Sequence, residues 1–170
     1  MFDFSASPLT VPDDLQDLFT STWADIASPG SGWSGAEKVA IAARSRTHRG
    51  GDPNPDADVP LPPAADEAIE MITLEPSRAT EEWVRHVVSG IGETKYVELV
   101  GVVAAVTGVD VMTEFLLGEL EPLPPPVAGN PIPDLNPRAR KRRGWVSMAG
   151  PPLPRNALSA VPATQAAANR

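Results

Sequence analysis

Two side chains in one stretch of this sequence could carry out acid–base chemistry. The stretch WSGAEKVAIAARSRTHRGG (residues 33–51) holds Glu37 near its start and His48 near its end. A carboxylate and an imidazole transfer protons when a fold brings them to one substrate. We favour a structural interpretation for each. Ser34 and Glu37 form the capping-box pattern that starts a helix, and His48 lies among arginines at its end, where cations meet the helix dipole.

Three further ionisable side chains are weaker candidates. Glu98 leads into the most apolar helical segment and could face a pocket, but a solvated carboxylate in a first helical turn is the favoured interpretation. Glu93 is expected to complement the dipole of the same helix. His86 lies opposite the apolar face of its own helix, four residues after Glu82, which predicts an exposed Glu–His pair.

The composition excludes several classes of site. The chain has no cysteine, which rules out disulfides, thiolate metal sites and every cysteine-based mechanism. It has only two histidines, so we expect no multi-histidine metal site and no cofactor. The N-terminal MFDFSASPLTVPDD has no secretory pattern, and the apolar run Leu99–Val109 suits a buried core helix better than a membrane span. We therefore expect a soluble, cytoplasmic protein.

The apolar periodicity predicts an all-α fold with five helices and no convincing strand. The first helix begins at Pro12 and stops at Ser28-Pro29-Gly30, with Leu18 on its apolar face. The others are expected at about 34–48, 64–74, 80–90 and 93–117, with a proline-rich loop at 52–63. The fifth helix, whose apolar residues include Ala104 and Phe115, is apolar on nearly all sides around 100–106. This pattern predicts that the helix is either the central helix of a bundle or part of a subunit interface. We expect a homo-oligomer that assembles through this long helix.

The chain divides at about residue 121 into a helical domain (1–121) and a proline-rich basic tail or linker (122–170). Residues 122–154 hold ten prolines, which favours extended chain that wraps or dangles. Residues 1–136 carry 22 acidic and 7 basic groups, whereas residues 137–170 carry 7 basic and no acidic groups. The basic run RARKRR (138–143) is expected to pack on the acidic body of the same or a neighbouring subunit. Nucleic-acid binding through this run is a minor alternative.

Several segments, taken in order, resemble the alkylhydroperoxidase AhpD-like proteins of the carboxymuconolactone decarboxylase superfamily. They are SGWSGAEKVAIAARSRTHRGG (31–51), LPPAADEAIEMITLEPSRATEEWVRHVVSGIGETKYVELVGVVAAVTGVDVMTEFL (61–116), PLPPPVAG (122–129) and GWVSMAGPPLPRNALSAVPA (144–163). The resemblance covers nearly the whole chain. It implies a helical fold that oligomerises through its long helices, with a relay of a glutamate, a CxxC pair and a histidine in the active peroxidases.

This chain keeps only part of that relay. Glu37 matches the family glutamate, but RGGD (49–52) stands where the cysteine pair is expected, and His48 precedes that position. The resemblance therefore implies a domain that is inactive as a peroxidase and acts as an oligomeric scaffold, or as half of a two-copy peroxidase-related protein. An alternative is a non-redox, decarboxylase-like enzyme in which Glu37, with or without His48, transfers protons on a small organic acid or lactone.

Overall fold

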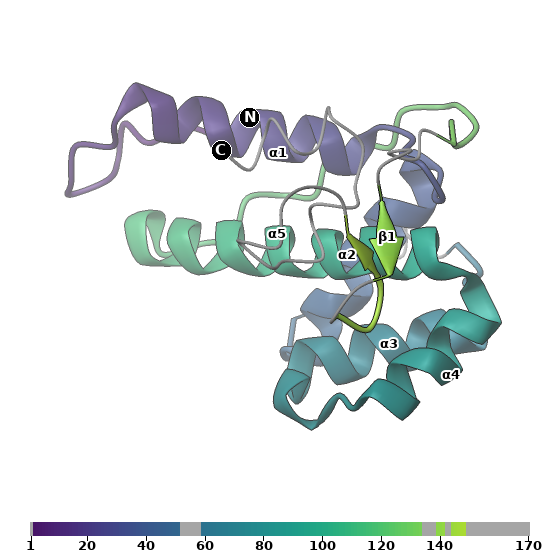
Figure 1. Ribbon diagram of the computed structural model, residues 1–170. Helices are drawn as coiled ribbons and strands as arrows, with labels where there is room; N and C mark the ends of the chain where they lie inside the picture. The colour runs from purple at the N-terminus through teal and green to yellow at the C-terminus, as the bar shows by residue number, and fades with distance from the viewer. Residues whose placement is uncertain (1, 52–58, 134–138, 142–143, 149–170) are drawn as a thin grey trace.

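The computed structural model describes residues 2–51, 59–133, 139–141 and 144–148 of the chain (Figure 1). Its helices are α1 (Asp13–Ala27), α2 (Gly35–His48), α3 (Pro63–Leu74), α4 (Glu81–Ile91) and α5 (Glu93–Leu117), with a 3-10 turn at Pro76–Arg78. The predicted all-α class is confirmed. Two antiparallel pairs of residues, β1 (Arg140–Lys141) and β2 (Ser147–Met148), are too short to alter it.

The helices begin and end where the local sequence favours a boundary. Pro12 precedes α1 with an extended backbone, and Asp13 and Asp14 occupy the first turn, where carboxylates meet the positive end of the dipole. The Thr80 hydroxyl caps α4 by accepting a hydrogen bond from the backbone of Trp83. Gly92, at a φ of +85°, separates α4 from α5, so α4 ends at Ile91 rather than at Gly90.

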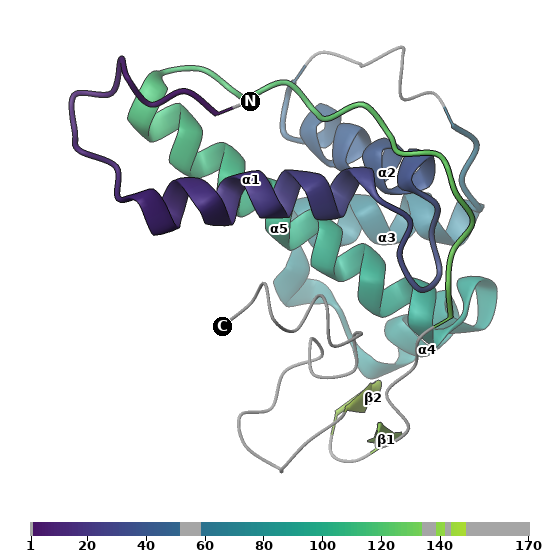
Figure 2. The same ribbon diagram turned by 90° about the horizontal axis from the view of Figure 1, so that it is seen from above.

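The helices gather around α5. In Figure 1 α1 lies along one side of α5, and α3 and α4 lie on the other side near its first turns. The view from above shows α1 crossing α5 at an angle, with α2, α3 and α4 gathered near the first half of α5 (Figure 2). The last turns of α5 therefore extend beyond α3 and α4 in both views.

Three apolar side chains that the sequence pattern placed among the apolar residues of their helices are exposed. Leu18 of α1 is 42% exposed, and Ala104 and Phe115 of α5 are also exposed, Phe115 at 70%. The buried side chains of these helices, among them Phe19, Trp23, Val106 and Leu116, lie on their other faces. Neighbouring helices cover one side of α5, so the apolar residues on its opposite side remain exposed.

The chain after α5 packs along the helices in extended form. The Trp23 indole donates to the carbonyl of Pro122 at 2.8 Å, and the amide of Val127 donates to the carbonyl of Ala27 at 2.8 Å. Further on, Val146 is buried, and Ser147 donates from its backbone and its hydroxyl to the carboxylate of Glu93. The described part of the proline-rich segment thus wraps around the helical body, which is one of the two forms expected of it.

Candidate functional site

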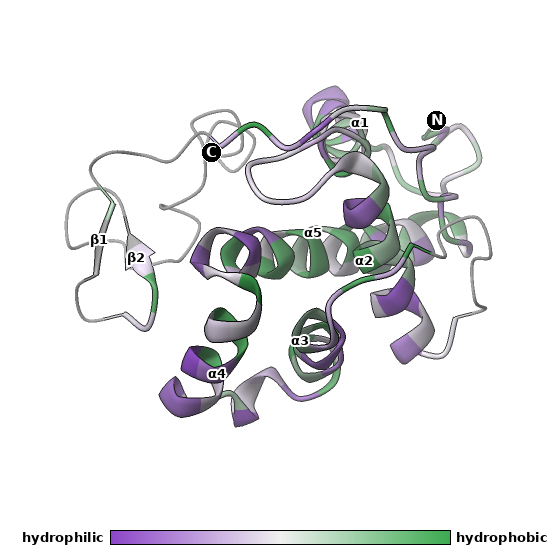
Figure 3. Cartoon of the chain, turned by 90° about the vertical axis from the view of Figure 1, so that its right-hand side faces the viewer, coloured by the Kyte–Doolittle hydropathy of each residue, from purple (hydrophilic) through white to green (hydrophobic). Residues whose placement is uncertain are grey.

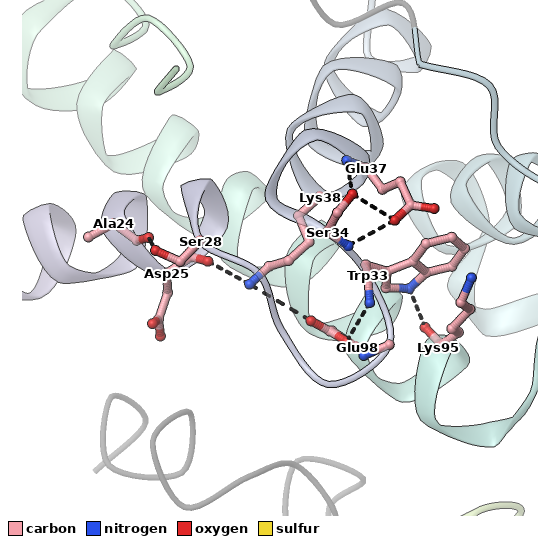
Figure 4. A network of polar contacts seen from close by, with 10 residues as sticks. Ala24, Asp25, Ser28, Trp33, Ser34, Glu37, Lys38, Lys95 and Glu98 are labelled. Carbon is pink, nitrogen blue, oxygen red and sulfur yellow. Dashed lines mark hydrogen bonds and ion pairs between the residues drawn. The ribbon is translucent and has the colours of Figure 1, made fainter. Parts of the chain in front are cut away.

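The side chain of Glu37 is engaged at the start of α2. The Ser34 hydroxyl accepts from the amide of Glu37 at 3.3 Å, while one Glu37 oxygen accepts from the amide and the hydroxyl of Ser34 at 2.8 and 2.7 Å (Figure 4). The predicted capping box is therefore confirmed. Glu37 is half-buried, and the hydrogen bonds of its carboxylate are with Ser34.

His48 lies far from Glu37. It is exposed in the last turn of α2, eleven residues after Glu37. Eleven residues of helix correspond to about 16 Å along the axis. The structure does not bring the two predicted site residues together, and no single small substrate could contact both from this arrangement.

Glu98, for which the sequence pattern favoured a solvated first-turn carboxylate, is almost completely buried. Glu98 is 2% exposed and lies in the first half of α5. One of its oxygens accepts from the backbone amides of Gly32 and Trp33 at 2.7 and 3.3 Å (Figure 4). The other has no hydrogen-bond partner, although the Lys38 ammonium lies 3.8 Å from it. The favoured interpretation of Glu98 as a solvated carboxylate was wrong.

Lys38 is the cation of this buried pair. It is 2% exposed and donates to the carbonyl of Asp25 at 2.5 Å, at the end of α1. Burial raises the pKa of the Glu98 carboxyl, against the opposing effects of the Gly32 amide and of Lys38. Burial likewise lowers the pKa of the Lys38 ammonium, opposed by Glu98 and Asp25. Both groups are thus held where their charged forms are less favourable than in water.

Glycines in the loop between α1 and α2 make room for this carboxylate. A Cβ atom on Gly30 would overlap the Glu98 carboxyl group, and one on Gly32 would lie 2.8 Å from Cγ of Lys95. The fully buried Trp33 closes the same loop onto α5, because its indole donates to the Lys95 carbonyl at 2.8 Å. The Lys95 ammonium lies 4.2 Å from the centre of the Trp33 ring. The loop therefore forms a tight cover over Glu98.

A second charged cluster joins the end of α2 to the middle of α5. Asp110, 1% exposed, accepts from Arg46 through both oxygens, at 3.0 and 2.5 Å, and from Arg49 at 2.5 Å. Arg46 also donates to the carbonyl of Glu121 at 2.8 Å. The sequence placed Arg46 and Arg49 beside His48 at the helix end, where basic residues favourably meet the dipole. Both bind a buried carboxylate.

The remaining predicted residues lie at the surface. His86 is exposed, as expected, but its nearest carboxylate is Glu67 of α3 at 3.6 Å rather than Glu82. This difference has a geometric reason: α3 packs beside α4 and offers a closer partner than the next turn of the same helix. The basic run 138–143 lies largely outside the described residues. Among the described residues, no three histidine or acidic side chains come together as a metal site would require.

The face of α5 turned away from α1 and α2 is apolar and mostly exposed, with Gly101 and Ala105 half-buried at its edge. Seven residues share it, and we call them the α5 face: Gly101, Ala104, Ala105, Gly108, Val111, Met112 and Phe115. At 100° per residue they fall within about 120° of the helix circumference. Val111, Met112 and Phe115 are 56%, 36% and 70% exposed. In Figure 3 the hydrophobic colouring extends along much of α5.

By length and composition, α5 is also the one described helix that could cross a membrane. Its most apolar 18-residue stretch has a mean hydropathy of 1.8, and 44% of that stretch is buried inside the fold. Buried Glu98 and Asp110 both belong to α5 and form ion pairs with α2. Core helices of soluble proteins share these features, so the composition alone does not define a membrane helix.

Sequence signals for these features were present but faint. Glu98 stands between Val97 and Leu99, and Lys38 directly precedes the apolar stretch Val39–Ala43, so a charge near each buried run was visible. Nothing in the sequence indicated that the loop at 30–33, some 65 residues earlier than Glu98, supplies the amides that bind it.

Comparison with known proteins adds no family: no family model, no curated protein and no solved structure matches this chain.

Proposed function

We propose that this chain is a cysteine-less, AhpD-like helical module, inactive as a peroxidase, that serves as an oligomeric scaffold, either alone or as a half-domain of a peroxidase-related protein. The observation that carries the proposal is the open α5 face, with Val111 and Phe115 more than half exposed. Contiguous apolar surface of this kind marks interaction sites in soluble proteins.

The side chains that could do chemistry support a scaffold rather than an enzyme. The chain contains no thiol to reduce a peroxide. One carboxylate oxygen of Glu37 accepts hydrogen bonds from the amide and the hydroxyl of Ser34. His48 is exposed about three helical turns away. Glu98 and Lys38, whose pKa values are shifted by burial, are each 2% exposed and join α2 and the loop before it to α5.

The non-redox alternative has weaker support. A decarboxylase-like enzyme acting on a small organic acid or lactone would need a carboxylate that a substrate can reach. Glu37 is reachable but occupied, and Glu98 is covered by the loop at 30–33. The proton-transfer proposal would gain support if Glu37→Gln abolished turnover of a lactone while leaving the thermal unfolding midpoint unchanged.

Light scattering after size exclusion tests the scaffold proposal on the full chain. We expect a mass of at least twice the 18.0 kDa of one chain, and no consumption of an alkyl hydroperoxide in the presence of a dithiol reductant. Phe115→Ser should shift the mass toward the monomer. The matched control is Ile132→Ser, which changes an equally exposed apolar side chain (73%) outside α5. A wild-type chain that is monomeric at all concentrations would overturn the proposal.

A further inference from the structure

We infer that the partner of the α5 face is a second copy of this chain, packed antiparallel along α5 with Gly108 close to the twofold axis. This inference rests on the self-association proposed above and adds its geometry. Three properties of the α5 face carry it: the order of side-chain sizes, the distribution of charge, and the area.

Side-chain size changes along the α5 face. Its first half consists of Gly101, Ala104, Ala105 and Gly108, and its second half of Val111, Met112 and Phe115. An antiparallel pair places the small half of one copy against the large half of the other, which gives close packing along the whole face. A parallel pair would place Phe115 against its own copy and leave the small residues facing each other across a gap.

Gly108 has no role within the single chain that requires glycine. A Cβ atom there would meet nothing within 4 Å, and its φ is not positive. Glycine inside a helix destabilises it by about 0.5–1 kcal/mol relative to alanine. A second helix crossing at this point supplies a reason for the residue, because two backbones approach closest where neither has a side chain.

The charges along α5 favour the same orientation. The last turn has no basic residue to oppose the negative end of the helix dipole, while Glu114 and Glu119 add further negative charge there. The first turn holds the positive end of the dipole, and its side chains Glu93 and Lys95 are opposite in charge. Antiparallel packing brings the first turn of each copy toward the acidic end of its partner. The seven residues of the α5 face carry no charge, so none is buried unpaired.

The area is at the lower limit for a weak, reversible dimer. The face is about 21 Å long at 1.5 Å per residue. From the exposed fractions and ordinary side-chain sizes, each copy would bury roughly 400–500 Å². The total is close to the roughly 1,000 Å² that separates specific interfaces from crystal contacts. A bilayer is a poorer occupant, because residues 1–136 carry 22 acidic and 7 basic groups and anionic lipids would repel them.

Because the chain has no cysteine, each introduced thiol is unique and cross-links report positions directly. Gly108→Cys should form a disulfide-linked dimer under mild oxidation, since the two thiols would meet at the axis. Phe115→Cys should not, because its two copies would lie about 21 Å apart along the axes. We expect about tenfold more dimer from the first variant, given the short Cα separation that a disulfide requires. Ala104→Cys mixed with Met112→Cys should give the mixed dimer in preference to either self-linked one.

The controls distinguish a failure of this inference from a failure of the scaffold proposal on which it rests. If the wild type is dimeric but Phe115→Cys cross-links as well as Gly108→Cys, the packing is parallel, and the inference fails while the scaffold proposal stands. If the wild type is monomeric, both fail. A chain truncated after residue 148 should still dimerise, and dimerisation lost with residues 149–170 would overturn the inference. Flotation of the wild type with phosphatidylcholine–phosphatidylserine vesicles would overturn it in favour of a lipid surface.

Discussion

Glu98 and Lys38 are each 2% exposed, and their charged atoms lie 3.8 Å apart. Burial removes most of the solvent around both charges, so each depends on the other and on the backbone groups around it. Replacing Lys38 by methionine keeps the volume and removes the cation. We expect Lys38→Met to lower the free energy of unfolding at pH 7 by about 3 kcal/mol, because a buried carboxylate is left without its counter-charge. Urea denaturation measures this loss.

Two further variants make the test of this pair specific. The double variant Lys38→Met with Glu98→Gln should recover most of the lost stability, because both charges are then absent. Lys95→Met is the matched control: it removes a neighbouring, half-buried lysine whose ammonium lies over the Trp33 ring, at an expected cost of about 1 kcal/mol or less. Equal losses from Lys38→Met and Lys95→Met would contradict a buried ion pair.

The raised pKa of Glu98 also has a consequence for pH dependence. The folded state holds the Glu98 proton to a higher pH than the unfolded chain, in which the pKa is about 4.3. The stabilising contribution of this proton is complete below that value and is lost as the pH rises through the folded-state pKa. The unfolding free energy of Glu98→Gln should therefore rise relative to wild type across this range. A stability difference that does not change with pH above the unfolded-state pKa would contradict the raised pKa of Glu98.

At the scale of elements, three parts of the chain pack closely around Gly35. A Cβ atom at this first residue of α2 would lie 2.7 Å from the carbonyl oxygen of Val127 and closer still to that of Ala27. The end of α1, the start of α2 and the extended segment after α5 therefore meet at a point with no room for a side chain. This close contact is a property of the packing and cannot be seen in the local sequence.

We expect Gly35→Ala to lower the free energy of unfolding by about 2–3 kcal/mol, since backbone must move to admit the methyl group. Gly108→Ala is the matched control, because a Cβ atom there meets nothing, and it should be neutral or stabilise the single chain by up to about 1 kcal/mol. Thermal denaturation at a concentration low enough to keep the chain monomeric compares the two. The packing described here would be wrong if both variants melted alike.

The helices were predictable because their boundaries are encoded locally. Capping by Ser34 and Thr80, the acidic first turn of α1 and the glycine near the end of α4 placed each helix to within a residue or two. The candidate site was not predictable in the same way. Glu98 is buried because amides of Gly32 and Trp33 reach it from a distant loop. Phe115 is exposed because no described helix covers that side of α5, although the helix itself is apolar on nearly all sides.

At the scale of the whole molecule, the dominant property is an uneven charge. Residues 1–136 carry 22 acidic and 7 basic groups, and residues 137–170 carry 7 basic groups alone. Two mechanisms of self-association follow from this distribution. Copies could join through the uncharged α5 face against the repulsion of their acidic bodies, or through attraction between the basic segment of one copy and the acidic body of another.

Salt separates these mechanisms because it screens repulsion and attraction alike. The Debye length falls from about 30 Å at 0.01 M to about 8 Å at 0.15 M. If the α5 face drives association, the dimer dissociation constant should fall by about tenfold over this range, since the repulsion between acidic bodies is weakened. Analytical ultracentrifugation of the full chain at several salt concentrations measures the constant, and Phe115→Ser should stay monomeric throughout. A dissociation constant that rises with salt would instead assign association to the basic segment.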